Sequence, residues 1–428
     1  MSWKAIYESK LCTAEEALSH VKSGDRISMG LMHGVSQVLI DALCARKDEL
    51  MDVTVFSSIN VCKEHYMDEG YAPHINYLNG FLFPASREAI KAGRIDYNSI
   101  YFHEFPMWMK TGFKPTVAMT VLTPPDEDGY CSFSMSADFT VAACQIADTV
   151  IAHINPCAPR TGGAKIHVSE LTCAVVEARP FLEAPSKPSG EVESKIASLI
   201  AERIGDGACL QLGIGGLPNT VLGMLGDRKD LGIHTELFSD GVIDLYEKGI
   251  INGAHKTTDP GKMVTTFILG TKRLYDFIDN NPDVLVLPVD YTNSPYNIAK
   301  NDNVVSVNAC LEVDLLGQVN ADSVGDYFYS GIGGQVDFVR GANMSKGGQS
   351  FLSLPSTALK GTTSTIVPRL QRPVTTSRHD VRSIVTEYGI ADLFGKNMRE
   401  RALALINIAH PDSREELTRQ AYEANYLY

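Results

Sequence analysis

The chain has 428 residues, of which 44% are hydrophobic and 21% charged, and its formal net charge is -13. This composition is typical of a soluble globular protein with two or three domains, and the acidic balance argues against non-specific binding to nucleic acid or to an anionic membrane. It does not exclude an anionic cofactor, which needs only a local basic patch or backbone N–H donors.

Strand-like and helix-like segments alternate along the chain. In chain order, a helix is expected at residues 14–21, strands at 53–56 and 149–154, a helix at 194–204, and strands at 284–287 and 304–307. The strand-like runs are mostly apolar, as is typical of strands covered on both faces. The alternation predicts an α/β protein with open, mostly parallel sheets.

A proline-rich linker divides these elements. Pro180, Pro185 and Pro188 prevent a regular element over residues 180–190. We therefore place a domain boundary near residue 187, which gives an N-terminal α/β domain at residues 1–186 and a C-terminal α/β domain at residues 187–428.

A weak internal repeat supports this boundary. A shift of 183 residues superposes Gly30 on Gly213, and a shift of 182 places Thr54 on Glu236. The repeat has two explanations, which the sequence leaves open: two homologous α/β domains, or the general likeness of any two βαβ units. In the first case only the second domain has a carboxylate at this position.

A glycine-rich segment follows the strand-like run that ends at Leu212. Gly213, Gly215 and Gly216 permit a close approach of the backbone, and Pro218 suits the first turn of a helix. Backbone N–H groups at such a helix N-terminus suit an anion or a developing oxyanion. A tight turn without a ligand is an alternative, and so is a dinucleotide-binding loop, although Pro218 replaces the third glycine of that fingerprint.

Glu236 stands near the end of the next strand-like run. Ser239-Asp240-Gly241 then forms a turn, and a helix follows through Val242 and Leu245. Open α/β sheets bind ligands at the carboxyl ends of their strands. Glu236 is therefore a candidate ligand for a ribose or a candidate nucleophile, because a carboxylate can form a covalent intermediate.

A second glycine cluster, residues 331–334, precedes another helix-like segment. It is either a turn or a further source of backbone donors. The cations nearest to it in the sequence, which are candidates to bind phosphates, are Arg340, Lys346, Lys360 and Arg369.

Taken together, these segments resemble the acetyl-CoA hydrolase/transferase family, in the branch of 4-hydroxybutyrate and butyryl-CoA:acetate CoA-transferases. The resemblance covers nearly the whole chain. The matching motifs are residues 213–218 (Gly-Ile-Gly-Gly-Leu-Pro), 234–241 (His-Thr-Glu-Leu-Phe-Ser-Asp-Gly), 331–338, 385–393, 124–132 and 155–156.

The resemblance implies two similar open α/β domains with the active site between them. It implies Glu236 as a nucleophile that forms a glutamyl-CoA thioester. Coenzyme A is then a substrate, with no permanently bound cofactor and no metal. The residues expected to bind CoA or the thioester oxygen are Gly213, Ile214, Gly215, Gly216, Leu217, Gly333, Gly334 and Lys360.

The expected function is transfer of CoA between a short-chain acyl-CoA and a carboxylic acid such as acetate, in a homodimer. Alternatives are an acyl-CoA hydrolase on the same scaffold, a dinucleotide-dependent oxidoreductase, and a CoA-binding protein without catalytic activity. Glu387 is either a second functional carboxylate or the first acid of a helix. Residues 30–36 depart from the family pattern, and the candidates for the acyl pocket are Met32, His33, Ser57, Ser58, Asn60 and Tyr388.

The remaining features concern the compartment. No run of 18 apolar residues indicates a membrane span, and the N-terminus lacks the pattern of a signal peptide. The nine cysteines include no Cys-x-x-Cys pair, so we expect reduced core thiols without a zinc site. We expect a cytoplasmic protein that binds neither nucleic acid nor membranes.

Overall fold

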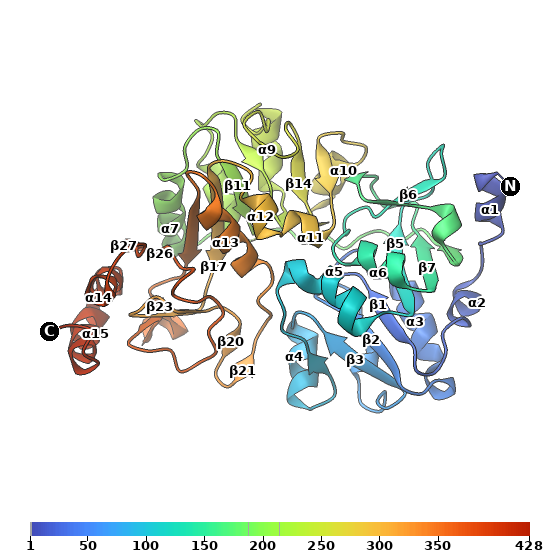
Figure 1. Ribbon diagram of the computed structural model, residues 1–428, viewed down its shortest axis with the longest axis horizontal. Helices are drawn as coiled ribbons and strands as arrows, with labels where there is room; N and C mark the ends of the chain where they lie inside the picture. Colours follow the sequence, from blue (N-terminus) through green and yellow to red (C-terminus); the bar gives the residue numbers. More distant parts are fainter. Residues whose placement is uncertain (1, 187, 214) are drawn as a thin grey trace. The chain divides into compact units, whose positions relative to one another are not determined.

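The computed structural model describes residues 2–186, 188–213 and 215–428 (Figure 1). The chain divides into two compact units: Met1–Ala184 with Val264–Thr292, and Pro185–Met263 with Asn293–Tyr428. The segment Val264–Thr292, which the predicted division places in the C-terminal domain, thus packs with the first unit. The predicted boundary at Lys187 lies outside the described residues.

The first unit is built on a seven-stranded parallel sheet. Its order is β10 (Cys173–Val176), β7 (Thr149–Ile154), β5 (Val117–Leu122), β1 (Arg26–Met29), β2 (Val53–Ser57), β3 (Ile75–Asn79) and β4 (Asp96–Tyr97). From β1 the strands follow one another toward one edge, and from β5 they follow one another toward the other edge. The direction of winding therefore reverses between β1 and β5, as in a doubly wound fold.

Helices and short strands complete this unit. The helices are α1 (Trp3–Glu8), α2 (Ala14–Leu18), α3 (Gln37–Ala45), α4 (Pro84–Lys91), α5 (Phe105–Trp108), α6 (Thr140–Ile146), α10 (Lys272–Ile278) and α11 (Val289–Thr292). β6 (Tyr130–Ser132) pairs with β9 (Lys165–His167), and β8 (Gly162–Gly163) with β16 (Val284–Val286). Local chemistry explains several helix starts: Thr13 and Glu16 form a capping box before α2, and the Ser36 hydroxyl accepts from Leu39 N–H at the start of α3.

The second unit has a six-stranded sheet. Its order is β12 (Gly232–Ile233), β11 (Cys209–Leu212), β17 (Val304–Ala309), β22 (Gln349–Ser353), β26 (Ser383–Thr386) and β27 (Gly389–Asp392). All neighbours are parallel except β26 and β27. Here the winding reverses between β11 and β17, so each unit has a reversal of the same kind.

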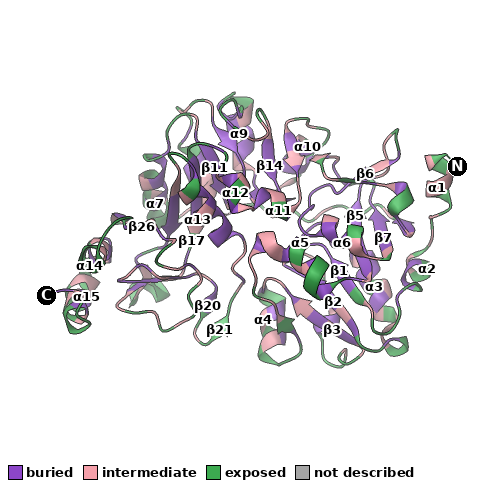
Figure 2. Ribbon diagram, in the orientation of Figure 1, coloured by how far each residue is buried: buried purple, intermediate pink, exposed green. Residues whose placement is uncertain are grey.

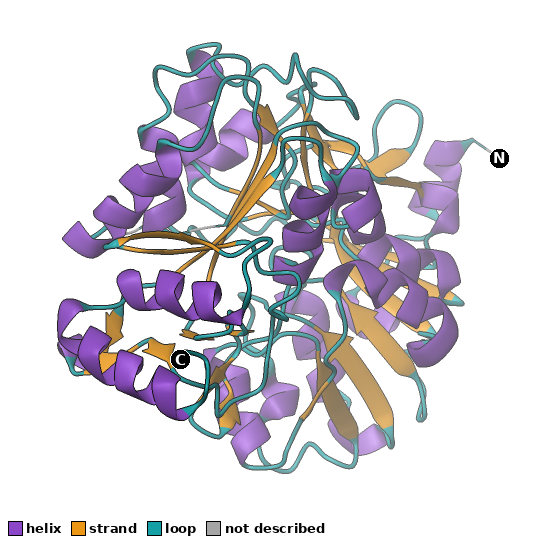
Figure 3. Cartoon of the chain, turned by 60° about the vertical axis from the view of Figure 1, so that its left-hand side comes forward, coloured by secondary structure: helices purple, strands orange, loops and turns teal. Residues whose placement is uncertain are grey.

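The helices of the second unit are α7 (Glu191–Ala201), α8 (Gly216–Gly223), α9 (Gly241–Glu247), α12 (Pro295–Ile298), α13 (Gln335–Met344), α14 (Met398–Asn407) and α15 (Pro411–Glu423). α14 and α15 pack against each other near the C-terminus (Figure 3). The short strands of this unit are β13 (Leu237–Phe238), β18 (Glu312–Asp314), β19 (Val319–Asn320), β20 (Ser323–Val324), β21 (Tyr327–Phe328), β23 (Thr357–Ala358), β24 (Thr363–Ser364) and β25 (Ile366–Val367). β14 (Met263–Thr265), except for Met263, and β15 (Phe267–Ile268) belong to the segment that packs with the first unit.

The strands of the two large sheets form the cores of their units. β5, β11 and β26 are buried along their whole length (Figure 2). The apolar runs at 53–56, 149–154 and 304–307 became β2, β7 and β17, and the α/β prediction is confirmed. The run at 284–287 became β16, which lies outside the large sheets.

The internal repeat is visible in the strand pairing, but its register differs from the sequence comparison. Arg26 of β1 pairs with Thr54, and Cys209 of β11 pairs with Gly232. Since the two first strands superpose at a shift of 183, Thr54 corresponds to Gly232. The residue of the first unit that corresponds to Glu236 is therefore Ser58, four residues later, and the assignment to Thr54 was wrong.

Candidate active site

The glycine-rich loop connects β11 to α8, as the sequence predicts. Gly215 has a φ of +114°, which favours glycine, and α8 begins at Gly216 with Leu217 in its first turn. Apart from the chain neighbours, no described residue has an atom within 4 Å of a methyl group placed on Gly213 or Gly215, so the backbone there is not crowded. Ile214, the remaining residue of the predicted loop, lies outside the described residues.

Glu236 lies in the bend between β12 and β13, three residues beyond the end of β12. The turn predicted after it leads into α9. Its Oε2 accepts a hydrogen bond of 2.7 Å from the Asn293 side-chain amide, and the backbone of Gly334 donates a second hydrogen bond. Asn293 is fully buried directly before α12, and Gly334 is the N-cap residue of α13. The carboxylate therefore lies at the N-terminal end of a helix, where a negative charge is favoured.

Only glycine fits at position 334. A Cβ atom there would lie 1.9 Å from Glu236 Oε2 and 2.2 Å from Asn293 Nδ2. The preceding Gly333 has a φ of +52°, which turns the backbone into the helix start. The structure thus brings Glu236 together with the second glycine cluster through Gly334.

Burial raises the pKa of Glu236 to about 7, and the hydrogen bond from Asn293 opposes this rise. The nearby Asp337 carboxylate raises the pKa further, whereas the Gly334 hydrogen bond lowers it. Asp337 is itself buried in the first turn of α13, 3.5 Å from the Asn293 amide nitrogen. The Glu236 residue as a whole is only partly buried. Burial of its carboxyl group is nevertheless the largest cause of the raised pKa. At neutral pH a substantial share of this carboxyl group is ionised.

Asn293 was missed by the sequence analysis. It follows the apolar strand β16 and the short helix α11, and the segment Tyr291-Thr292-Asn293-Ser294-Pro295 contains no charged side chain that would mark it. Its Oδ1 is buried and accepts no hydrogen bond from the described residues, although its amide nitrogen is engaged. A buried acceptor without a hydrogen bond costs stability, and a catalytic role is one explanation for such a group in a native structure.

Two family models match the chain: the acetyl-CoA hydrolase/transferase N-terminal domain over residues 1–183, and the C-terminal domain of the same family over residues 270–421. The chain belongs to the acetyl-CoA hydrolase/transferase family. It is accordingly an enzyme of the CoA-transferase class, and its α/β fold is that of CoA-transferase structures.

Several known proteins are similar to this chain over nearly their full length. The 4-hydroxybutyrate coenzyme A transferase of Clostridium kluyveri is 46% identical, over 97% of this chain and 98% of its own. The succinyl-CoA:cyclohexane-1-carboxylate CoA transferase of Geobacter metallireducens is also 46% identical, over 100% and 98%. The crystal structure of RipA from Yersinia pestis covers 100% of both chains at 38% identity, with a TM-score of 0.95.

The cations proposed for phosphate binding have different surroundings. Lys360 lies exposed in the short 3-10 helix Leu359–Gly361, and no described contact links it to Glu236. Arg340 pairs with Asp380 at 3.1 Å and Lys346 with Asp302 at 3.4 Å, while Arg369 is exposed. Contacts of Lys360 with CoA therefore stay a prediction for this family member.

Glu387 does not begin a helix, and that alternative is wrong. It lies in the turn between the antiparallel strands β26 and β27, where both of its oxygens accept hydrogen bonds from Ser356, from the backbone N–H at 2.9 Å and from the hydroxyl at 2.6 Å. Tyr388, beside it, contacts the ring of His410. Glu387 thus secures the buried Ser356, which accounts for a carboxylate at this turn.

The other pocket candidates lie in the first unit. Met32 N–H donates to Ile59 O, and Met32 forms an isolated parallel β-bridge with Asn60. The Ser57 hydroxyl donates to Gly30 O. The loop after β1 and the segment after β2 are therefore in contact, as expected if Met32, Ser57 and Asn60 line one pocket.

None of the described helices has the length and apolar character that a membrane crossing requires.

Proposed function

We propose that this protein transfers CoA between a short-chain acyl-CoA and a carboxylic acid, with the Glu236 carboxylate as the nucleophile. The observation that carries the proposal is the placement of this carboxylate between the Asn293 amide and the Gly334 backbone, at the N-terminus of α13. The relatives named for 4-hydroxybutyrate and for cyclohexane-1-carboxylate support an organic acid as the partner of CoA.

The first half-reaction loads CoA onto the enzyme. The Glu236 carboxylate attacks the acyl-CoA carbonyl, and the C–S bond breaks to give an acyl-glutamyl anhydride and CoA thiolate. The thiolate then attacks the glutamyl carbonyl and releases the first acid as its carboxylate. A glutamyl-CoA thioester remains, and no net proton transfer is required.

The second half-reaction runs in the opposite sense with a different acid. Its carboxylate attacks the glutamyl thioester, thiolate leaves, and a new acyl-glutamyl anhydride forms. The thiolate attacks the acyl carbonyl of this anhydride, which gives the new acyl-CoA and restores the Glu236 carboxylate. Because the substrates and the products are each one acyl-CoA thioester and one carboxylate, the reaction can proceed in both directions.

The hydrogen-bond donors around Glu236 have a role in each step. Every attack builds negative charge on an oxygen, and a donor already in place stabilises that charge by about 3 kcal/mol. Gly334 N–H and the Asn293 amide are the candidates when the attacked carbonyl belongs to Glu236. The uncrowded backbone at Gly213 and Gly215 supports the expectation that this loop contacts CoA.

CoA is a substrate in this scheme rather than a resident cofactor. The proposed acyl groups are 4-hydroxybutyryl, butyryl and acetyl, with acetate as an acceptor. Hydrolysis would follow the same first half-reaction, with water in place of the second acid. A coupled assay that compares transfer to acetate with release of free CoA separates the two activities.

Intact-mass analysis after incubation with butyryl-CoA tests the covalent step. We expect an adduct of the mass of CoA, less one water, that maps to Glu236 and is absent in Glu236→Gln. Borohydride reduction traps the same thioester as an independent readout. If neither method detects a modified Glu236 in an active preparation, the glutamyl-CoA mechanism is excluded.

A further inference from the structure

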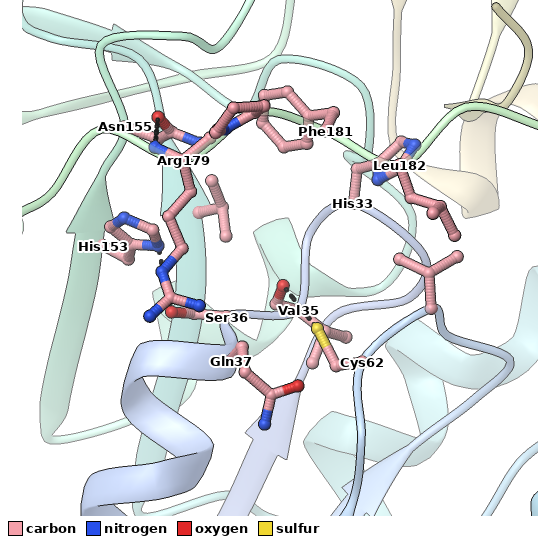
Figure 4. Close-up of a pocket in the computed structure, with 13 residues that line it drawn as sticks. His33, Val35, Ser36, Gln37, Cys62, His153, Asn155, Arg179, Phe181 and Leu182 are labelled. Atoms are coloured by element: carbon pink, nitrogen blue, oxygen red, sulfur yellow. Dashed lines mark hydrogen bonds between the residues drawn. The ribbon is translucent and has the colours of Figure 1, made fainter.

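A cavity of about 230 Å³ lies in the first unit, at the carboxyl edge of its seven-stranded sheet (Figure 4). Its walls come from the loop after β1, from the ends of β5 and β7, and from residues 179–182 after β10. The winding of the sheet reverses between β1 and β5, and open α/β sheets bind their ligands at such a reversal. In the second unit, the loop that contains Gly213 and Gly215 occupies the equivalent reversal between β11 and β17.

Most polar side chains of the cavity wall are already bonded within the protein. His153 Nε2 donates to Glu177 O at 2.9 Å, so Nδ1 is the acceptor for the Ser36 hydroxyl at 3.0 Å. Burial lowers the pKa of His153, which keeps the ring neutral. The Asn155 amide nitrogen donates to Arg179 O at 2.8 Å, and its Oδ1 accepts from Arg179 N–H at 3.0 Å. These groups shape the wall and carry no charge.

Other polar side chains of the cavity lining are also hydrogen-bonded within the protein. His33 Nε2 lies 2.8 Å from the Tyr275 hydroxyl, which in turn donates to Leu182 O at 2.8 Å. Burial lowers the pKa of His33 to about 4, so this ring is neutral as well. The Gln37 amide donates to Asp41 at 2.8 Å and to Lys63 O at 3.0 Å.

Arg179 is the charged residue among those that line the cavity. Its side chain extends from the segment after β10 toward Ser36 and Gln37 (Figure 4). Nε is bound to the Glu177 carboxylate, and the planar guanidinium has further N–H donors suited to a second carboxylate. Val35, Val61, Val121 and Phe181 give the rest of the cavity an apolar surface.

This combination of one cation and apolar walls selects a class of ligand. A monocarboxylate needs one guanidinium group and places its alkyl chain against apolar side chains. At about 30 Å³ for each water-sized group, the cavity has room for about seven such groups. We propose that this cavity binds a short-chain aliphatic carboxylate, with the carboxylate on Arg179 and the alkyl chain against Val61, Val121 and Phe181.

Calorimetric titration of the full-length, CoA-free protein with butyrate tests the proposal. Glu236→Gln is titrated in parallel, because butyrate affinity that depends on Arg179 and not on Glu236 assigns the binding to this cavity. Arg179→Gln should weaken butyrate binding at least about tenfold, which corresponds to about 1.4 kcal/mol. Val61→Trp, at a half-buried position, should weaken it similarly by filling the cavity.

The matched control is Arg26→Gln. Arg26 is an exposed arginine at the start of β1, at the amino ends of the strands and away from the cavity at their carboxyl ends, and its replacement should change butyrate affinity less than twofold. Butan-1-ol, which has the alkyl chain without the charge, should neither bind nor compete. Hydrogen exchange should slow on addition of butyrate in peptides that contain residues 33–37 and 179–182.

The proposal is overturned if butyrate does not bind, if Arg179→Gln and Val61→Trp both leave its affinity unchanged, or if those peptides show no protection. It stands apart from the covalent mechanism. Loss of the Glu236 adduct with Arg179-dependent binding intact would contradict only the proposed function, and the reverse result would contradict only this inference.

Discussion

Each unit contains one glutamate whose pKa is raised by burial to about 7, and the two differ in what surrounds them. Glu64 of the first unit is 3% exposed. It accepts hydrogen bonds from the hydroxyls of Tyr66 and Tyr77, the second at 3.2 Å. Glu236 of the second unit is less buried, and its donors are the Asn293 amide and the Gly334 backbone.

A raised pKa is therefore not the property that distinguishes Glu236, the proposed nucleophile, from Glu64. A tyrosine hydroxyl can both donate and accept. The hydrogen bonds around Glu64 can therefore form whether its carboxyl group is protonated or ionised. An amide N–H and a backbone N–H donate only, and therefore favour the ionised form that a nucleophile needs. The type of donor and the access to the carboxylate distinguish the two sites.

The largest expected effect comes from exchanging each carboxyl group for an amide. Glu236→Gln should lower the rate of CoA transfer by about four orders of magnitude or more, because the nucleophile is removed. Glu64→Gln, the matched control, should keep kcat within about threefold for the folded protein. Steady-state assays with butyryl-CoA and acetate, normalised to the folded fraction, measure both. Equal losses of kcat in the two variants would contradict a special role of Glu236 relative to Glu64.

The next effect concerns the glycines near Glu236. Gly334→Ala should lower kcat by about 10²- to 10³-fold, because the methyl group displaces the carboxylate and its donor. Gly213→Ala, where a methyl group meets no atom within 4 Å, should leave the melting temperature of the ligand-free protein unchanged. A rise in KM for acyl-CoA in Gly213→Ala, with kcat kept, would sharpen the assignment of that loop to CoA. A Gly334→Ala enzyme with wild-type kcat would refute the close approach.

A smaller effect should appear in the pH dependence. Since the nucleophile must be ionised, kcat/KM should rise about tenfold per pH unit below pH 7 and level off above it. Asn293→Ala removes a hydrogen bond that lowers this pKa, so the midpoint should move upward. A rate loss without a shift of the midpoint would mean that Asn293 has only a packing role.

The smallest effect is on the free energy of unfolding, and it tests the buried site of Glu64. The Glu64 carboxyl group has a pKa of about 7 when folded and an ordinary value of 4.5, so the folded state retains a proton that the unfolded state has lost. Its contribution is therefore largest at low pH and declines as the pH rises from 4.5 to 7. Glu64→Gln should cost about 1–3 kcal/mol at pH 5 and flatten that decline. Urea unfolding at pH 5 and pH 8 measures both, and an unchanged slope would contradict the assignment.

The sequence predicted the elements that are decided by local pattern. Apolar runs gave β2, β7 and β17, and the glycines after Leu212 gave the loop before α8. The position of Glu236 beyond a strand was predicted for the same reason. These features depend on residues close together in the chain, where periodicity and turn chemistry are informative.

Features that depend on distant residues were not predictable. Asn293 is 57 residues from Glu236, and only folding brings its amide to the carboxylate. The correspondence of Ser58 with Glu236 required the strand register, because neither of the sequence shifts, 182 or 183, places Ser58 on Glu236. Glu387 was ambiguous because a turn between strands and a helix start both favour polar residues.

The order of the three groups along the chain has a consequence for synthesis. Glu236 precedes Asn293, and Asn293 precedes Gly334, which is 98 residues after Glu236. At about 5–20 residues per second, a ribosome adds Gly334 roughly 5–20 s after Glu236. During that interval the nascent chain has the carboxylate without the backbone donor at the start of α13. A polypeptide released before this point therefore lacks the complete group, and the proposed site is assembled only when most of the chain has been translated.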